Sequence, residues 1–146
     1  MSRRRQLRVP NSDPVKIAAL SFALLVAIFL GVTLWALEGQ EVAVLRTFDA
    51  SGRLRETRTW IADEGNFAWI EAANPQRPFL LMIQARPEVE LIRAGRTQAL
   101  RALPVPTREG HEKIRRLLEA KYGWADCWIG FLTDTSNSVA IRLEPR

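Results

Sequence analysis

The sequence predicts a small, mainly β domain, an antiparallel barrel of six strands with one or two packed helices, that follows a single membrane-spanning helix. Three observations predict this architecture. An uncharged apolar run lies near the N-terminus, short apolar and β-branched segments alternate with turn residues after it, and one amphipathic stretch lies near the C-terminus. The chain of 146 residues leaves room for one modest domain.

The apolar run extends from Ile17 to Leu37 without a charged residue. At about 1.5 Å per residue, a helix of this length matches a hydrocarbon core about 30 Å thick. Trp35, near the end of the run, is of a type that favours the membrane interface. We therefore predict a basic tail at 1–16, a transmembrane helix at 17–37 and a folded domain at 38–146.

Most of the net charge of +5 lies in the N-terminal tail. Against Asp13 alone, the tail holds the basic residues Arg3, Arg4, Arg5, Arg8 and Lys16. The domain itself is close to neutral, which excludes a broad basic surface for nucleic acid. By the positive-inside rule, the N-terminus is expected in the cytoplasm and the domain on the extracytoplasmic side of the cell membrane.

Two other interpretations of the N-terminus remain open. A cleaved signal peptide has a shorter apolar run and a small-x-small cleavage site, which "LWALEGQE" does not offer. The stretch "SRRRQLR" (2–8) resembles the twin-arginine export signal, with Gln6 where that signal has Phe. We prefer an uncleaved, single-pass anchor with a plain basic flank, because "VPNSDPVK" separates the motif from the apolar run.

Segments with alternating apolar residues predict six strands. The turns "DASG" and "DEGN" separate the first three strands, which we expect to form a meander. The next two form a hairpin around Gly95, and "FLLMIQA" (79–85) between them and the meander is expected to be a helix or turn that covers one end of the barrel. The predicted strands are 41–48, 53–62, 67–73, 89–94, 97–105 and 139–145.

One amphipathic helix is predicted over 108–122, between Thr107 as its N-cap and Gly123 as its end. "WADCWIGFL" (124–132) predicts a second, shorter helix. Strands in short hairpins favour a small barrel, because closure leaves no long edge exposed. The apolar stripe of the first helix consists of Ile114, Leu117, Leu118 and Tyr122.

Familiar hydrolytic, nucleotide-binding and metal-binding motifs are absent from the sequence. The one His, His111, is expected on a polar helix face, and the one Cys, Cys127, is expected to be buried, so neither a metal site nor an internal disulfide is predicted. An enzyme of this composition would depend on a cofactor, to which the protein contributes binding, orientation and electrostatics.

The turn "DASG" leads into a run of arginines, and this pattern has two interpretations. Ser51 and Gly52 offer backbone N–H groups and a hydroxyl, and Arg53 and Arg55 follow at once, so the corner could hold a phosphate. The alternative is an outer strand whose arginines are solvated and pair with neighbours such as Asp49, an arrangement that contributes little stability.

Four stretches, "SGRLRETRTWIADEGNFAWIEAA", "ARPEVEL", "LEAKYGWAD" and "VAIRLEP", follow one another within residues 42–145. In this order they resemble the deazaflavin (F420)-dependent nitroreductase family, which belongs to the FMN-binding split-barrel proteins related to pyridoxamine-phosphate oxidase. The resemblance implies a six-stranded antiparallel split β-barrel that binds F420 or FMN. It also implies a homodimer, and hydride transfer to a nitro, quinone or other unsaturated acceptor.

The resemblance places the family's phosphate-contacting S-G-x-x-R loop on Ser51, Gly52 and Arg55. Tyr122 and Trp124 flank the Gly at which a helix ends and are expected to form a pocket wall, and Tyr122 is the candidate proton donor. The expected cofactor-binding residues are Ser51, Gly52, Arg53, Arg55, Thr57, Trp60, Phe79 and Trp124.

The ring-binding side departs from the family pattern P-x-W-x-x-N-L-x-A-N-P. Phe79 stands at the Trp, Met82 at the first Asn and Arg86 at the second, and a Met cannot make the hydrogen bonds of an Asn. This departure leaves three alternatives for the site: a different flavin, another ligand such as haem, or no cofactor at all. The resemblance and the apolar run together imply a membrane-anchored oxidoreductase with a lipophilic acceptor. The alternative is a non-catalytic, membrane-tethered ligand-binding or assembly module.

Overall fold

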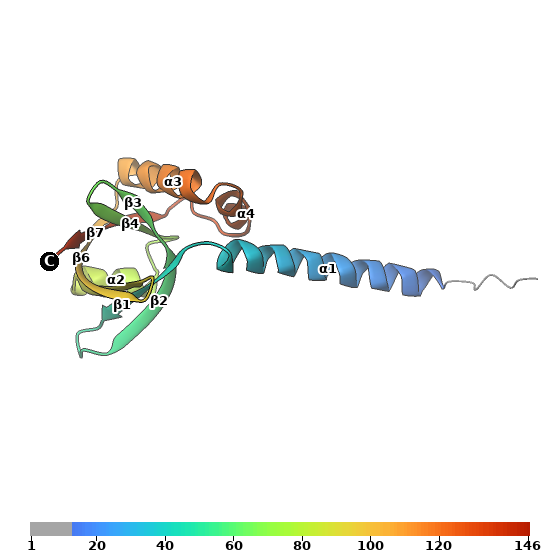
Figure 1. Ribbon diagram of the computed structural model, residues 1–146, viewed down its shortest axis with the longest axis horizontal. Helices are drawn as coiled ribbons and strands as arrows, with labels where there is room; N and C mark the ends of the chain where they lie inside the picture. Colours follow the sequence, from blue (N-terminus) through green and yellow to red (C-terminus); the bar gives the residue numbers. More distant parts are fainter. Residues whose placement is uncertain (1–12) are drawn as a thin grey trace, which may run out of the picture. The chain divides into compact units, whose positions relative to one another are not determined.

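The computed structural model describes residues 13–146. They fall into two compact units, one that ends at Thr33 and one of residues 34–146, which we call the barrel domain. Figure 1 shows the elements in chain order. The twin-arginine motif and the basic residues at 3, 4, 5 and 8 lie outside the described residues.

Helix α1 (Pro14–Glu38) contains the predicted apolar run. Pro14 occupies its first position, where the fixed φ of proline suits a helix, and the carbonyl of Asp13 accepts a hydrogen bond from the N–H of Ile17 at 3.1 Å. The most apolar 18-residue window has a mean hydropathy of 2.6, and none of it is buried. The helix is long and apolar enough to cross a membrane, and the crossing itself stays a prediction.

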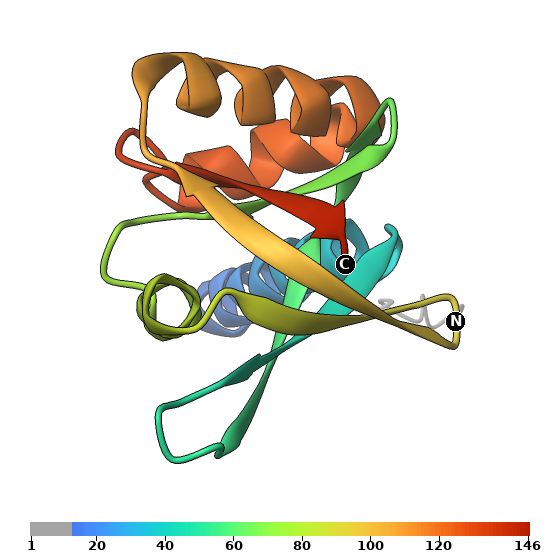
Figure 2. The ribbon, with the colours of Figure 1, turned by 90° about the vertical axis from the view of Figure 1, so that its left-hand side faces the viewer.

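A seven-stranded antiparallel sheet forms the barrel domain and curls into a half-barrel (Figures 1 and 2). The hairpin predicted around Gly95 is confirmed, since β5 and β6 pair from Glu88–Arg101 to Arg93–Arg96. In order across the sheet, the strands are β2 (Leu54–Trp60), β1 (Val42–Phe48), β5 (Glu88–Arg93), β6 (Arg96–Val105), β7 (Val139–Pro145), β4 (Phe67–Ala72) and β3 (Ala62–Glu64).

The sheet has one strand more than predicted because the predicted strand 53–62 breaks at Ile61. Before the break β2 pairs with β1, and after it β3 pairs with β4. At the break, the N–H of Ile61 donates to the hydroxyl of Tyr122 at 3.1 Å, and the carbonyl of Ile61 accepts from that hydroxyl at 2.8 Å. A side chain therefore satisfies the backbone groups that a continuous strand would present to a neighbouring strand.

The predicted meander of the first three strands is wrong at its third member. β4 pairs with β3 and with β7, which is the last strand of the chain. β2 lies near β4 but shares no backbone ladder with it. This interruption is the split of the barrel, and it leaves side chains of β2 and β4 to line the space between the two strands.

Four helices occur among residues 13–146: α1, α2 (Pro78–Ala85), α3 (Arg108–Tyr122) and α4 (Trp124–Leu132). The segment predicted as a helix or turn is thus helix α2. For α3, the hydroxyl of Thr107 accepts from the N–H of Gly110 at 3.1 Å, and Gly123 ends the helix with a φ of 52°. Both predicted boundaries of α3 are confirmed.

Two clusters of buried side chains hold the helices on the sheet. Inside the curl, Phe79, Leu80 and Ile83 of α2 pack against residues of β1, β4, β5, β6 and β7. On the other face of the sheet, Ile114 and Leu118 of α3 pack near Trp69. Figure 2 accordingly shows α3 and α4 on one side of β4 and β7, and α2 on the other.

Candidate functional site

The Ser-Gly corner predicted to hold a phosphate already holds a carboxylate of the chain. Oδ1 of Asp49 accepts from the N–H of Ser51 at 2.9 Å, from its hydroxyl at 2.6 Å and from the N–H of Arg53 at 2.8 Å. The hydroxyl of Ser51 first, and then these N–H groups, lower the pKa of Asp49. The donors expected for a phosphate are therefore engaged by a local anion.

The surroundings of this corner match the interpretation in which the arginines lie on a solvated outer strand and pair with neighbouring acidic residues. Ser51 and Gly52 are exposed, and the side chain of Arg53 is 83% exposed with its Nε 3.7 Å from Asp49. Glu56 pairs at 2.8 Å with Arg46 of β1. The corner is thus a solvated turn at the edge of the sheet, and Arg55 is the member of the predicted loop that reaches a cavity.

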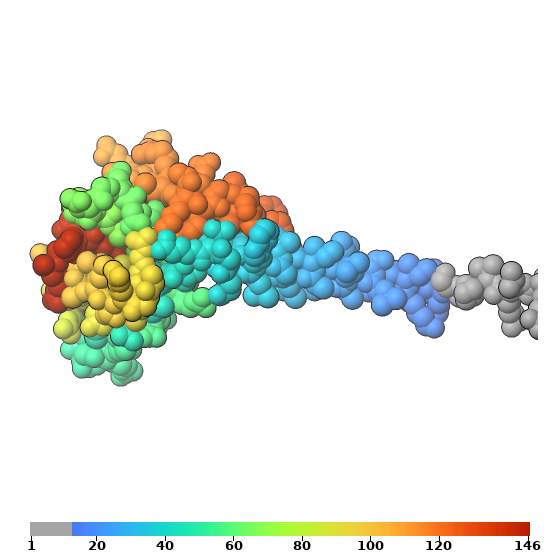
Figure 3. All heavy atoms as spheres, viewed as in Figure 1, coloured from blue at the N-terminus to red at the C-terminus, as the bar shows by residue number. Residues whose placement is uncertain are grey.

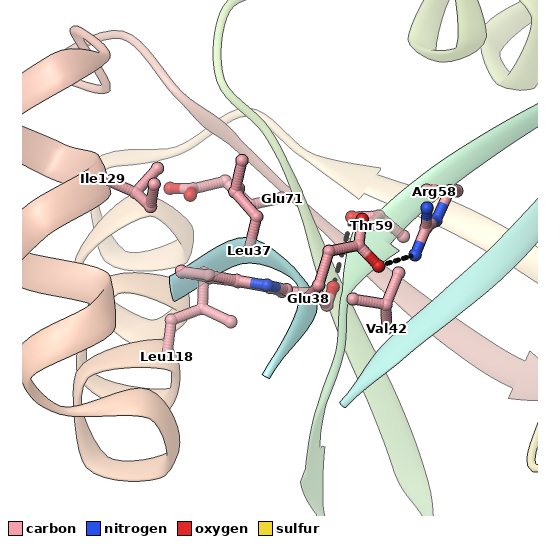
Figure 4. Close-up of a pocket in the computed structure, with 9 residues that line it drawn as sticks. Leu37, Glu38, Val42, Arg58, Thr59, Glu71, Leu118 and Ile129 are labelled. Carbon is pink, nitrogen blue, oxygen red and sulfur yellow. Dashed lines mark hydrogen bonds and ion pairs between the residues drawn. The ribbon is translucent and has the colours of Figure 1, made fainter. Parts of the chain in front are cut away.

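Two adjoining cavities lie where β2 passes β4, and we call them together the split groove. Figure 4 shows the residues that line the larger cavity. Their volumes are about 290 Å³ and about 190 Å³, and together they fall in the size range of small-molecule sites. Arg58, Thr59 and Glu71 line both cavities, so the two lie next to each other.

The two ends of the split groove differ in character. The larger end is mainly apolar and is lined, besides Glu38 and the shared residues, by Leu37, Val42, Trp60, Leu118 and Ile129. The smaller end is more polar and is lined, besides the shared residues, by Arg55, Thr57, Ala73, Arg77, Pro78 and Phe79. Such a groove suits an elongated ligand with a flat apolar body and an anionic end.

Arginines give the smaller end its charge. Arg58 is neutralised by Glu38, which it contacts at 2.6 Å. Arg55 and Arg77, in contrast, form no ion pair with any residue of 13–146 that the structure describes. Two guanidinium groups at one end of a groove therefore lack a counter-ion, which is the charge pattern that a phosphate or carboxylate group satisfies.

Glu71 is the acidic residue at the centre of the split groove. Its Oε2 accepts from Arg115 at 2.9 Å, and its side chain is only 11% exposed. Its Oε1 is buried and has no hydrogen-bond partner among the described residues. A buried acceptor without a donor costs free energy, so an N–H or O–H group of a bound ligand would be favourable here.

Trp60 and Tyr122 were predicted near the cofactor, and the structure separates their roles. Their rings stack with centroids 4.6 Å apart, and Trp60 lines the split groove whereas Tyr122 does not. The hydroxyl of Tyr122 lies 2.8 Å from the carbonyl of Ile61 and 2.9 Å from that of Glu41. Burial raises the pKa of Tyr122. We therefore withdraw Tyr122 as proton donor and assign it to holding the strand break.

Replacing Tyr122 with Phe is expected to lower the free energy of unfolding by about 1–2 kcal/mol, because the N–H of Ile61 loses its partner. Ligand binding in the split groove is expected to stay unchanged, since the ring that stacks on Trp60 remains. Urea unfolding and a ligand titration of the same variant check both statements. Weaker binding at unchanged stability would contradict this assignment.

The remaining predicted residues divide between the groove and other places. Thr57 and Phe79 line its smaller end, and most of Phe79 is buried in the core. Trp124 lines neither cavity; it lies against Trp35 with ring centroids 5.0 Å apart. Met82, at the family's Asn, accepts a hydrogen bond at 3.5 Å from the buried hydroxyl of Thr47, so its sulfur serves as a weak acceptor.

The expectation that Cys127 is buried is wrong. Cys127 is exposed, because α4 turns Ala125 and Asp126 inward and presents Cys127 outward. His111, expected on a polar helix face, is half-buried, and its Nδ1 lies 2.8 Å from the hydroxyl of Ser138. Neither side chain lines the split groove. No group of metal-binding side chains occurs within the described part of the chain.

Sequence reasoning missed several residues of the groove, above all Glu71 and Arg77. A signal existed for Arg77, which is the basic residue of the loop "NPQRP" between β4 and α2. A weaker one existed for Glu71, the single charged residue in an otherwise apolar strand. Thr59 follows Arg55 and Thr57 by alternation along β2 and could have been included on that ground, whereas Arg58 could not.

No protein-family model matches the chain, and a search of curated proteins finds no match. Solved structures resemble it in fold. An F420 reductase is 22% identical, with a TM-score of 0.53 over 77% of this chain and 92% of that one. A putative pyridoxamine 5′-phosphate oxidase from Listeria innocua is 15% identical, with a TM-score of 0.56 over 77% and 90%. The haem storage protein HutZ from Vibrio cholerae is 14% identical, with a TM-score of 0.55 over 76% and 85%.

These likenesses concern architecture, because identities below one quarter do not carry a shared activity. The order of sequence motifs, the curled antiparallel sheet and the three solved structures point to the same architecture. The barrel domain therefore has the split-barrel fold of the F420 reductases and the pyridoxamine-phosphate-oxidase-like proteins.

Proposed function

We propose that this chain is a membrane-anchored oxidoreductase that binds F420 or FMN in the split groove and reduces a lipophilic nitro, quinone or other unsaturated acceptor. The observation that carries the proposal is the pair Arg55 and Arg77, which lack counter-ions at one end of a groove whose other end is apolar. Both cofactors combine a flat ring system with an anionic side chain, and the two ends of the groove match these parts.

At the smaller end, Arg55 and Arg77 would bind the phosphate by charge-assisted hydrogen bonds, and the hydroxyl of Thr57 adds a neutral donor. At the larger end, Trp60 and the aliphatic side chains around it would hold the ring system and exclude water from it. The buried Oε1 of Glu71 would accept an N–H of that ring system. When bound, the cofactor supplies the hydride.

The membrane anchor is consistent with a lipophilic acceptor. Residues Leu37 and Glu38, at the end of the apolar helix, line the split groove. If α1 spans the bilayer, the groove therefore opens next to the membrane surface, where it could take up a lipophilic acceptor dissolved in the bilayer. The positive charge of the tail favours an extracytoplasmic domain, and a C-terminal phosphatase fusion, active only when exported, tests that side.

Binding is tested with the full chain in lipid nanodiscs, mixed separately with FMN and with F420. We expect one of them to stay bound through gel filtration and to change its absorbance spectrum. Failure of the full chain to retain either cofactor would contradict the proposal.

The second candidate is a non-catalytic, membrane-tethered ligand-binding or assembly module on the same fold. Met82 favours it, because a residue that the family uses for hydrogen bonds is here turned to Thr47 of the core. A haem-binding version is less well supported, because the only His, His111, lies outside the split groove. Retained cofactor without turnover of a soluble quinone would favour this module. The expected homodimer belongs to the proposal and follows from the resemblance alone.

A further inference from the structure

Helix α4 presents an apolar face to its surroundings. Trp124 is 45% exposed and Phe131 is 83% exposed, and Cys127, between them at helical spacing, is also exposed. Leu132 extends the same apolar surface. The only charged residue of the helix, Asp126, is buried and points away from this face. A short helix that buries its charged residue and exposes its aromatic rings presents a surface that is unfavourable in water.

An ion pair and a buried side chain hold α4 in its orientation. Arg115 of α3 binds the carboxylate of Asp126, whose side chain is 6% exposed, and also binds Glu71 of β4. Ala125, next to Asp126, is fully buried. The domain therefore holds the inner face of α4 firmly, and this determines that Trp124, Cys127 and Phe131 face outward.

The start of α4 is located by its contact with the end of α1. Trp124 lies against Trp35, and Trp35 is three residues from Glu38, the last residue of α1. In a spanning helix these residues lie at the boundary between hydrocarbon and headgroups, where Trp is enriched. Since the contact lies within the barrel domain, Trp124 shares that depth whatever direction the rest of α1 takes.

We propose that the outer face of α4 lies in the headgroup region of a lipid bilayer, as a second membrane contact beside α1. The inference rests on the anchoring part of the proposed function. The aromatic side chains of the face suit this region, where an apolar ring and a wet surface coexist. A lipid surface is favoured over a second copy of the chain because Trp124, at one end of this face, contacts Trp35 near the end of the apolar helix.

This contact also affects the groove. Ile129, on the inner side of α4, lines the apolar end of the split groove. A helix with one side in lipid and the other at the groove gives an acceptor dissolved in the membrane a short route to the site. It also keeps the groove at a constant distance from the bilayer surface.

The single cysteine of the chain makes the proposal testable without removing other thiols. A nitroxide is attached to Cys127 of the full chain, which is reconstituted in phosphatidylcholine vesicles. Collision rates of the label with oxygen, which partitions into lipid, and with a water-soluble nickel chelate are then measured. The control carries Cys127→Ser and Gln98→Cys, which places the label on an exposed residue of β6.

At Cys127, the ratio of oxygen to nickel collisions is expected to be several-fold higher than at position 98. Phe131→Asp, with the label at Cys127, is expected to lower the ratio toward the control value while cofactor retention stays unchanged. Equal ratios at the two positions would overturn the proposal. Protection from both reagents, with dipolar broadening between labels, would assign the face to a second copy and also overturn it.

Flotation of the vesicles separates this inference from the anchor on which it rests. If the chain floats with the vesicles but gives equal ratios, the anchor is supported and only the α4 contact is contradicted. If the chain does not float, both the anchor and the α4 contact are contradicted. Neither result bears on the retention of FMN or F420 by the split groove, which gel filtration of the chain in nanodiscs measures separately.

Discussion

Replacing Arg115 with Met is expected to lower the free energy of unfolding by about 3 kcal/mol, the largest loss that we predict for a single substitution. Arg115 donates to Glu71 at 2.9 Å and to Asp126 of α4. The two carboxylate side chains are 11% and 6% exposed. Without the guanidinium, two negative charges stay buried close together, and α4 loses its attachment to α3.

The matched control is Arg116→Met, one position along the same helix, where the side chain is exposed and forms no ion pair within the described chain. It is expected to change stability by less than about 0.5 kcal/mol. Adding Glu71→Gln and Asp126→Asn to Arg115→Met is expected to restore part of the loss, because the uncompensated charges are then absent. Equal unfolding curves for the variants at 115 and 116, measured by tryptophan fluorescence in urea, would contradict this account.

The same ion pair explains why the exposure of Cys127 could not be predicted. From composition alone, "WADCWIGFL" is an apolar helix with one acidic residue, and such a residue is normally placed outside. Which side faces the domain depends on Arg115, on a different helix. Helix α3 and the hairpin around Gly95, in contrast, were predictable, because their capping residues and alternation are local in the sequence.

The site divides in a similar way. The carboxylate of Asp49 occupies the Ser-Gly corner through contacts two and four residues away, so the sequence held this information and its significance was missed. The split groove was beyond prediction, because it exists only where β2 passes β4 without pairing. That arrangement depends on the break at Ile61, which a tyrosine 61 positions later holds open.

Arg55→Ala and Arg77→Ala are each expected to weaken the binding of FMN about tenfold, the effect of losing one charge-assisted hydrogen bond of about 1.5 kcal/mol. Both arginines line the smaller end of the split groove without a counter-ion among the described residues. Riboflavin has the same ring system without the phosphate. Its affinity is therefore expected to change little in either variant, and the ratio of the two affinities isolates the phosphate contact.

Arg53→Ala is the control that separates the groove from the corner predicted by the sequence. Arg53 is mostly exposed and lies near Asp49, which already occupies the donors of the turn. We expect this variant to bind FMN and riboflavin like the unchanged chain. A selective loss of FMN affinity in Arg53→Ala, with Arg55→Ala unaffected, would place the phosphate at the Ser-Gly corner. Such a result would require Asp49 to release its hydrogen bonds, because a carboxylate and a phosphate cannot share the same donors without strong repulsion.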